Sequence, residues 1–332
     1  MNVNKTSENF VVTDIRKVEA GSAIDRIHFL GDSALFVLGD GDLLLQPENG
    51  EACKIALFDG ALLSSAVSDA ALFAGSDSGT VVRWRPGADP ETIATDEKLR
   101  WIDHVAADDD GSVAWAAGKQ VFLRKPGGET RSVDTPSTAG ALAFSNSSLG
   151  IAHYNGVTLM SRDGGSPKTL AFDGMHTGIS FHPDGDFFVT RMRDPVLHGW
   201  CLKEGGEHAM EGYAEAVRSV SWVSGGQWLA TSGARYLALW PIRQPQNPIS
   251  NVPILLAGYR AVSTAVACHP HLGVVAVGYA DGAVLLVRIE DEAEILIKNP
   301  SGAAVVALEW NAFGSQLAIG CNDGSGRAIS FA

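Results

Sequence analysis

The stretch that decides the fold is GISFHPDGDFFVTRMRDPVLHGWC, residues 178–201. It reads as three short strands, one at 179–181, one at 187–190 and one ending at Trp200. A tight turn joins the first two strands, because Pro183 presets φ and Gly185 accepts a backbone angle that side chains resist. Proline and glycine recur too often for a sustained helical period, so we expect strands and not a helix here.

The same unit recurs along the chain. Residues 220–222 begin another copy, with a turn at Gly225-Gly226, a second strand at 228–231 and a third strand ending at Trp240. The ends of the third strands lie 37 to 47 residues apart and form the series Leu45, Trp84, Leu123, Met160, Trp200, Trp240, Val287 and Phe331. A period of about forty residues with four short strands per unit is the signature of a β-propeller.

This repeat resembles the WD40 family of β-propellers over almost the whole chain. The resemblance rests on the period and the strand pattern. The family's Gly-His and Trp-Asp dipeptides are absent, and three of the third strands end in Trp84-Arg85, Trp200-Cys201 and Trp240-Pro241. The resemblance implies an all-β fold, and the eight units predict an eight-bladed ring. Seven blades is the alternative, because the unit at 101–135 is the weakest, with Ala107 where other units have an aromatic residue.

We expect residues 1–332 to form a single propeller domain. The predicted blades are 25–60, 63–97, 101–135, 140–174, 178–214, 218–257, 263–299 and 304–332. The last unit has only three strands, whereas residues 9–18 form a strand with no unit of its own. That strand should complete the last blade and close the ring, since a missing strand would leave an exposed edge. Residues 1–8 are expected to be a disordered terminus. The proline-rich segment 241–253 predicts an exposed loop, either a structural extension or a docking loop.

Composition limits the class of protein. The formal net charge is −13, which argues against nucleic-acid binding because that needs a basic face. The four cysteines lie far apart without CxxC spacing, which indicates buried small apolar residues. The first residues lack a signal-peptide pattern, and no apolar run is long enough to span a bilayer. We therefore expect a soluble cytoplasmic monomer with no membrane partner.

No motif predicts catalysis, a metal site or a cofactor. His269 and His271 flank a proline, but no third ligand stands at a metal-like spacing. The run Asp108-Asp109-Asp110-Gly111 resembles part of a calcium loop, but it lacks the alternating spacing and the final glutamate, so a solvated turn is favoured. Hydrolase-elbow and phosphate-loop patterns are absent.

The candidate site is positional. The resemblance implies that the loops before each first strand and the turns after each second strand share one face, which commonly binds peptides. Those loops contain Arg26, Arg100, Trp101, His176, Arg191, Arg193, Arg218, Arg235, Tyr236, Tyr259, Arg260 and Tyr279. Of these, we take as candidate partner-binding residues Arg100, Trp101, His176, Arg191, Arg193, Arg218, Arg235, Tyr259 and Arg260. Arginine and aromatic side chains are good anchors for an acidic or extended peptide. The alternative is that the arginines form structural ion pairs with acids such as Asp25, Asp194 and Glu215.

The sequence thus predicts a non-catalytic scaffold that binds a partner peptide or protein on the channel face. Two alternatives stay open. One is a propeller enzyme with an active site in the central channel, and the other is a nucleic-acid binder that uses the arginines.

Overall fold

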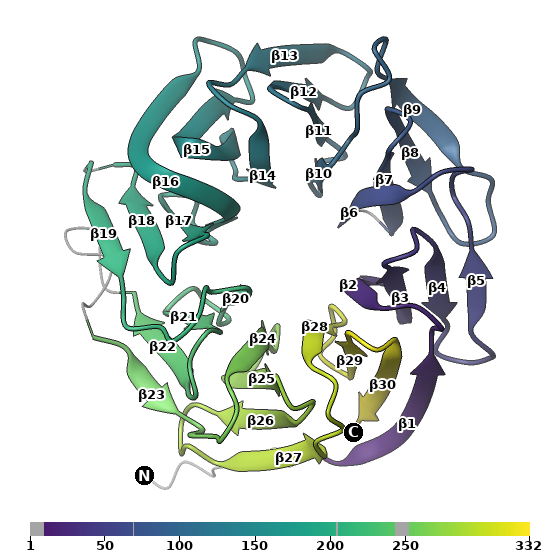
Figure 1. Cartoon of the computed structure of the whole chain (residues 1–332), viewed down its shortest axis with the longest axis vertical. Coiled ribbons are helices and arrows are strands. Elements are labelled where there is room, and N and C mark those ends of the chain that lie inside the picture. Colours follow the sequence, from purple (N-terminus) through teal and green to yellow (C-terminus); the bar gives the residue numbers. More distant parts are fainter. Residues whose placement is uncertain (1–9, 69, 204, 243–251) are drawn as a thin grey trace, which may run out of the picture.

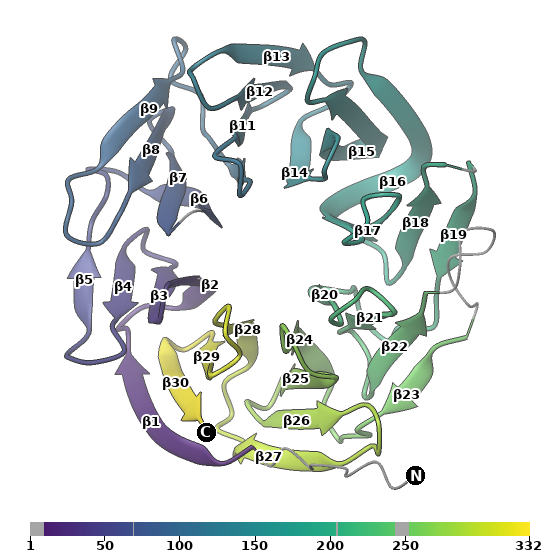
Figure 2. The ribbon, with the colours of Figure 1, turned by 180° about the vertical axis from the view of Figure 1, so that it is seen from behind.

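A computed structural model describes residues 10–68, 70–203, 205–242 and 252–332, and within them the chain forms strands, turns and loops. Figure 1 shows the sheets arranged as a ring, with the first strand of each repeat nearest the axis and the last at the circumference. The view from behind shows the same ring with its opposite rim toward the reader (Figure 2). The predicted terminus at 1–8 and most of the proline-rich segment 241–253 lie outside the described residues.

Among the described residues, six of the seven sheets have four antiparallel strands, and in five of these six each strand pairs with its neighbour in the chain. The first sheet consists of β2 (Ile24–Leu30), β3 (Ser33–Leu38), β4 (Leu43–Gln46) and β5 (Cys53–Ile55). The second consists of β6 (Leu62–Ser68), β7 (Ala71–Ser76), β8 (Thr80–Trp84) and β9 (Glu91–Thr95). The third consists of β10 (His104–Ala107), β11 (Val113–Ala117), β12 (Gln120–Arg124) and β13 (Thr130–Asp134). Two more are β20 (Val220–Trp222), β21 (Trp228–Thr231), β22 (Leu237–Pro241) and β23 (Ile254–Leu256), and β24 (Ser263–Cys268), β25 (Val274–Tyr279), β26 (Val284–Arg288) and β27 (Glu294–Lys298). The sixth combines β28 (Val305–Trp310), β29 (Gln316–Cys321) and β30 (Ser325–Phe331) with the N-terminal strand β1 (Val12–Glu19).

The seventh sheet has six strands and holds two of the predicted units. Its strands are β14 (Ala139–Phe144), β15 (Ser148–Ser161), β16 (Lys168–Phe181), β17 (Phe187–Met192), β18 (Leu197–Cys201) and β19 (Glu207–Met210). The first half of β16 pairs with β15 and the second half with β17, so one continuous strand is the outer strand of one unit and the inner strand of the next.

The prediction of eight blades therefore needs correction: the described residues form seven hydrogen-bonded sheets. The reason is pairing between separate segments: Met175 pairs with Tyr154 and His176 pairs with Met192, so residues 168–181 form one continuous strand where other units have a loop. The unit at 101–135, which we expected to be the weakest, forms its own sheet of β10 to β13.

The N-terminal strand closes the ring. β1 runs antiparallel to β30 from Val12↔Phe331 to Glu19↔Ser325, and Figure 1 shows it at the circumference beside the C-terminus. Val18 of this strand is buried in the core. Phe10 meets the Phe331 ring edge-on at 5.4 Å between centroids, which adds an aromatic contact at the seam.

The core lies between neighbouring sheets. The second strands β11, β25 and β29 are buried along their whole length because sheets cover both of their faces. Glycines on the second strands let the next sheet approach closely: a Cβ at Gly278 or Gly320 would collide with Val305 or Ile24 of the following first strand. Alanine at either position should therefore separate two sheets.

The cysteine expectation holds only in part. Cys201 and Cys321 are buried, whereas Cys53 is exposed on the outer strand β5, so it is not a core residue.

Candidate functional site

The loops before the first strands and the turns after the second strands lie on one face, because backbone hydrogen bonds join them. Gly39 N donates to Ala23 O at 2.8 Å, and Ala280 N donates to Val262 O at 2.9 Å. Between neighbouring repeats, Ser263 N donates to Ala234 O at 2.8 Å. We call this surface the loop face.

Arg100 lies on the loop face in a structural ion pair. Its Nη2 is 2.5 Å from Asp96 Oδ1 and 3.0 Å from Gln120 Oε1, and its Nη1 donates to Ala117 O at 3.1 Å. Hydrogen bonds from Arg100 hold the pKa of the buried Asp96 carboxyl below its ordinary value. The pair fixes the loop that presents Trp101, whose side chain is 65% exposed.

Arg260 is also paired. Its Nη2 and Nε each lie 3.1 Å from Asp281 Oδ2, which accepts a further hydrogen bond from the Tyr259 hydroxyl at 3.2 Å. Arg260 stays well exposed in this arrangement, whereas Asp281 is mostly covered. The structural alternative from the sequence therefore applies to Arg100 and Arg260, although their partners are Asp96 and Asp281 rather than the acids we named.

His176 is not on the surface. It is fully buried in β16, where its Nε2–H donates to Phe172 O at 3.1 Å and Nδ1 accepts from Thr190 Oγ1 at 2.8 Å. Desolvation lowers its pKa, so the ring is neutral at pH 7. The continuous β16 places in the core a residue that we expected in a loop, and we remove His176 from the candidate site.

Arg191 packs against the inner strand of its own unit. Its guanidinium lies over Gly178, where a Cβ would collide with it, and it donates to Arg218 O. Desolvation lowers the pKa of Arg191, and the positive charge of Arg26 on β2 lowers it further. The charge of Arg26 therefore acts on Arg191 from a different sheet of the ring.

Three exposed candidate arginines of the loop face have no anionic partner among the described residues. Arg193, Arg218 and Arg235 are exposed, and Asp194 and Glu215 form no ion pair with them there. Their backbones are nevertheless fixed: Arg193 N donates to Met175 O at 3.0 Å, Arg218 N to Ser232 Oγ at 3.2 Å, and Arg235 O accepts from Tyr259 N at 2.8 Å. Tyr236 next to Arg235 is 46% exposed.

A serine and a histidine from neighbouring first strands also lie within hydrogen-bonding distance, His28 on β2 and Ser65 on β6. His28 Nε2 lies 2.9 Å from Ser65 Oγ, which is the pairing of a nucleophile with its base. However, desolvation and the charge of Arg26 lower the pKa of His28 to about 4, so it is a weak base at neutral pH. No carboxylate within the described ranges bonds to its other ring nitrogen. The geometry thus lacks the group that would orient a catalytic histidine.

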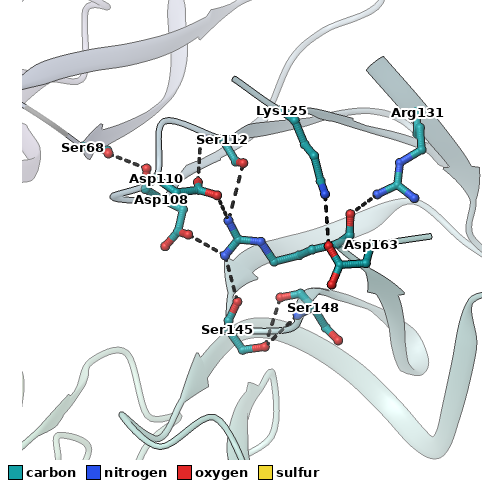
Figure 3. A network of polar contacts seen from close by, with 10 residues as sticks. Ser68, Asp108, Asp110, Ser112, Lys125, Arg131, Ser145, Ser148 and Asp163 are labelled. Carbon is teal, nitrogen blue, oxygen red and sulfur yellow. Dashed lines mark hydrogen bonds and ion pairs between the residues drawn. The ribbon is translucent and has the colours of Figure 1, made fainter. Parts of the chain in front are cut away.

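The opposite rim carries contacts that hold sheets together. The guanidinium of Arg162 is ion-paired with Asp108 and Asp110 and donates to Ser145 O at 3.1 Å. Figure 3 shows these partners close together. Two carboxylates of the aspartate run that resembles a calcium loop are therefore ion-paired with one arginine, and no group of three metal-ligating side chains occurs in the described part of the chain.

The His-Pro turns have a structural role as well. His182 Nε2–H donates to Gly226 O at 3.0 Å, and His269 Nε2–H donates to Gly314 O at 3.1 Å, each across to a neighbouring repeat. A Cβ at Gly226 or Gly314 would collide with the imidazole. The recurrence of His-Pro at one position of the repeat was the sequence signal for this bridge, although it did not reveal the partner.

The described residues include no helix long and apolar enough to cross a membrane.

The comparisons with known proteins agree with this architecture. A family model described as WD domain, G-beta repeat, matches residues 206–240, which run from β19 through β22 to Trp240. No curated protein matches the chain. The crystal structure of the computationally designed Ika8 protein has a TM-score of 0.72 and 17% identity, with 94% of this chain and 97% of that chain covered, so it supports the fold alone. The repeat match at residues 206–240 and the propeller fold together support a similarity of this chain to WD40-repeat β-propellers.

Proposed function

We propose that this protein is a non-catalytic scaffold that binds an acidic segment of a partner protein on the loop face. Propellers of the WD40 family are generally protein-interaction scaffolds. The observation that carries the proposal is the set of three exposed arginines, Arg193, Arg218 and Arg235, which have no anionic partner among the described residues.

Charge supports this assignment. In a protein with a net charge of −13, unpaired arginines on one face create a local positive field within an acidic surface. Neighbouring cations repel each other, and a carboxylate-bearing ligand would relieve that repulsion. Arginine suits such a ligand because its planar fork can form two parallel hydrogen bonds with one carboxylate.

Rigidity supports it as well. The backbones of these arginines are bonded to neighbouring loops, so little backbone entropy is lost when a ligand binds. Trp101 and Tyr236 add exposed aromatic surface to the same face, and aromatic and arginine side chains dominate the energy of protein interfaces.

The test is charge reversal of the unpaired arginines, Arg218→Glu with Arg235→Glu. Arg100 and Arg260 are unsuitable because their loss would leave Asp96 and Asp281 without a partner. The matched control is Lys17→Glu with Lys168→Glu, because both lysines are exposed on outer strands. Binding is measured by fluorescence anisotropy against a library of labelled acidic peptides and by crosslinking in the native host.

We expect the arginine variant to lose binding at least tenfold with an unchanged melting temperature, while the control variant binds as the native protein does. Equal binding by both variants would refute the loop face as the site. A preference for single-stranded nucleic acid over every acidic peptide, with a steep loss of affinity on adding salt, would favour the nucleic-acid alternative instead.

A further inference from the structure

A second site is lined by the first strands β20, β24 and β28. A cavity of about 380 Å³ lies between them, and its lining includes Ser219, Ser221, Cys268 and Glu309. Pro270 and Ala312 from the turns after these strands line it too. These turns lie at the rim opposite the loop face, so the cavity belongs to the other end of the ring axis.

The walls of this cavity are fixed by hydrogen bonds. Ser219 Oγ donates to Val266 O at 3.1 Å, and Cys268 N donates to Ser221 Oγ at 2.9 Å, so β20 is tied to β24. On the other side, Trp310 Nε1 donates to Ala267 O at 3.2 Å, which ties β28 to β24. The Ser219 hydroxyl proton is therefore committed to the wall, and Ser221 Oγ is held in place as an acceptor.

Glu309 is the only acidic or basic side chain in the lining of this cavity. It is exposed, and no hydrogen bond or ion pair joins its carboxylate to any described residue. Although the side chain is open to solvent, the protein atoms around it partly desolvate the carboxylate and raise its pKa to about 7.

The ionisable neighbours do not supply that counter-charge. Burial raises the pKa of the Cys268 thiol to about 12, so it stays neutral. On β2, the next first strand beyond β28, His28 has a pKa of about 4 and is neutral at pH 7.

We propose that this cavity binds the cationic end of a lysine or arginine side chain, with the Glu309 carboxylate as its counter-ion. The volume admits one such side chain, and the fixed walls would hold it without rearrangement. This site is independent of the loop face, since it has the opposite charge and lies at the opposite rim.

The test uses small cations of defined chemistry. Butylguanidinium and butylammonium are titrated into the full chain, with tetramethylammonium as a cation that cannot donate hydrogen bonds. Binding is followed by the ¹³C chemical shift of the Glu309 carboxyl carbon. The variant is Glu309→Gln, which keeps the shape and removes the charge, and the matched control is Glu129→Gln at an exposed turn. Tripeptides with central lysine, arginine or norleucine form a separate arm of the test.

We expect saturable binding of both hydrogen-bonding cations to the native protein and to Glu129→Gln. In Glu309→Gln the affinity should fall at least tenfold. Binding to that variant is followed by backbone amide chemical shifts, because it lacks the carboxyl group. Affinity should fall about tenfold from pH 8 to pH 6 as Glu309 takes up a proton. Binding of the lysine or arginine peptide, but not the norleucine peptide, supports a side chain as the ligand. Binding of the free cations without the peptides would overturn the side-chain assignment. Equal binding by Glu309→Gln, or by tetramethylammonium, would overturn the site itself.

Discussion

Replacing Arg162 with methionine tests whether the rim opposite the loop face is held by charge. Arg162 is only 11% exposed, with Nη1 2.5 Å from Asp108 Oδ2 and Nη2 bonded to Asp110. Ser68 Oγ donates to Asp108 O at 2.6 Å, so the network connects three successive repeats (Figure 3). Methionine keeps much of the length of the side chain and removes all of its donors.

The magnitude follows from the burial of the partners. Breaking a fully buried ion pair costs about 3–5 kcal/mol, because a charge is left without compensation. Here Asp108 is 30% exposed and Asp110 is 51% exposed, so water can partly replace the arginine. We therefore expect Arg162→Met to lower the free energy of unfolding by about 2 kcal/mol. For a chain of 332 residues this corresponds to a fall in melting temperature of about 3 °C.

The assay is equilibrium denaturation in urea, with Lys125→Met as the control. Lys125 Nζ lies 3.2 Å from Asp163 Oδ1, but both side chains are well exposed, so that loss should cost less than about 0.5 kcal/mol. Adding Asp108→Asn to Arg162→Met should recover part of the stability, because one uncompensated charge is removed. If Arg162→Met costs no more than Lys125→Met, the reasoning is wrong.

The remaining predictions concern the seam, a buried histidine and the axis. Deleting residues 1–20 removes the seven residue pairs of β1 with β30, so we expect aggregation and a fall in melting temperature of several degrees; an unchanged melting temperature would contradict closure by this strand. His198 is buried without a hydrogen-bond partner for either ring nitrogen among the described residues, and desolvation lowers its pKa to about 4. The unfolded chain binds this proton more readily, so the free energy of unfolding falls as the pH drops from about 6.5 to 4. The His198→Phe variant lacks this group, so between pH 8 and pH 5 its free energy of unfolding, measured by urea denaturation, should fall by about 2 kcal/mol less than that of the native protein. The raised pKa of Glu309 means that its ionised form destabilises the folded chain, so the pH dependence has the opposite sign. In thermal denaturation, Glu309→Gln should therefore raise the free energy of unfolding by about 1 kcal/mol at pH 9, after allowance for screening by solvent, and leave it unchanged at pH 4.

The ring could be predicted from the sequence because its signals are local. Turn residues such as Pro183 and Gly185 act within a few positions, and Gly185 has the positive φ of 76° that its turn needs. The repeat of these signals every forty residues or so is enough to indicate a propeller. The unit with Ala107 also forms its own sheet, because its Val113–Ala117 strand supplies the buried core.

The merger of two units in one sheet could not be predicted. Whether residues 173–177 form a loop or continue a strand depends on the pairing of Met175 with Tyr154 and of His176 with Met192, which are contacts between separate segments. The same contacts decide that His176 is buried. Sequence reasoning placed this residue in a loop because it assumed equal repeats.

The loop face was predicted from topology, whereas the partners of its arginines were not. Arg100 pairs with Asp96 only because the loop between them bends back on itself, and Arg260 pairs with Asp281 across two loops. The sequence does not indicate the role of Arg162, because this residue follows the end of a third strand and its aspartate partners lie more than fifty positions away. Periodicity specifies where a side chain is displayed, and the packing of loops specifies whether it is already paired.

The two ends of the ring axis differ in charge in a way that separates the two proposed sites. The positive charge of Arg26 lowers the pKa of Arg191 toward the loop face, while Glu309 is the only charged side chain among the described lining residues of the cavity toward the other rim. An acidic ligand is attracted to the first end and a cationic side chain to the second, so neither ligand competes for the other's counter-ion. Reversal of Arg218 and Arg235 should therefore leave cation binding at Glu309 intact, and Glu309→Gln should leave acidic-peptide binding intact. Loss of both activities in either variant would mean that the two ends act as one site.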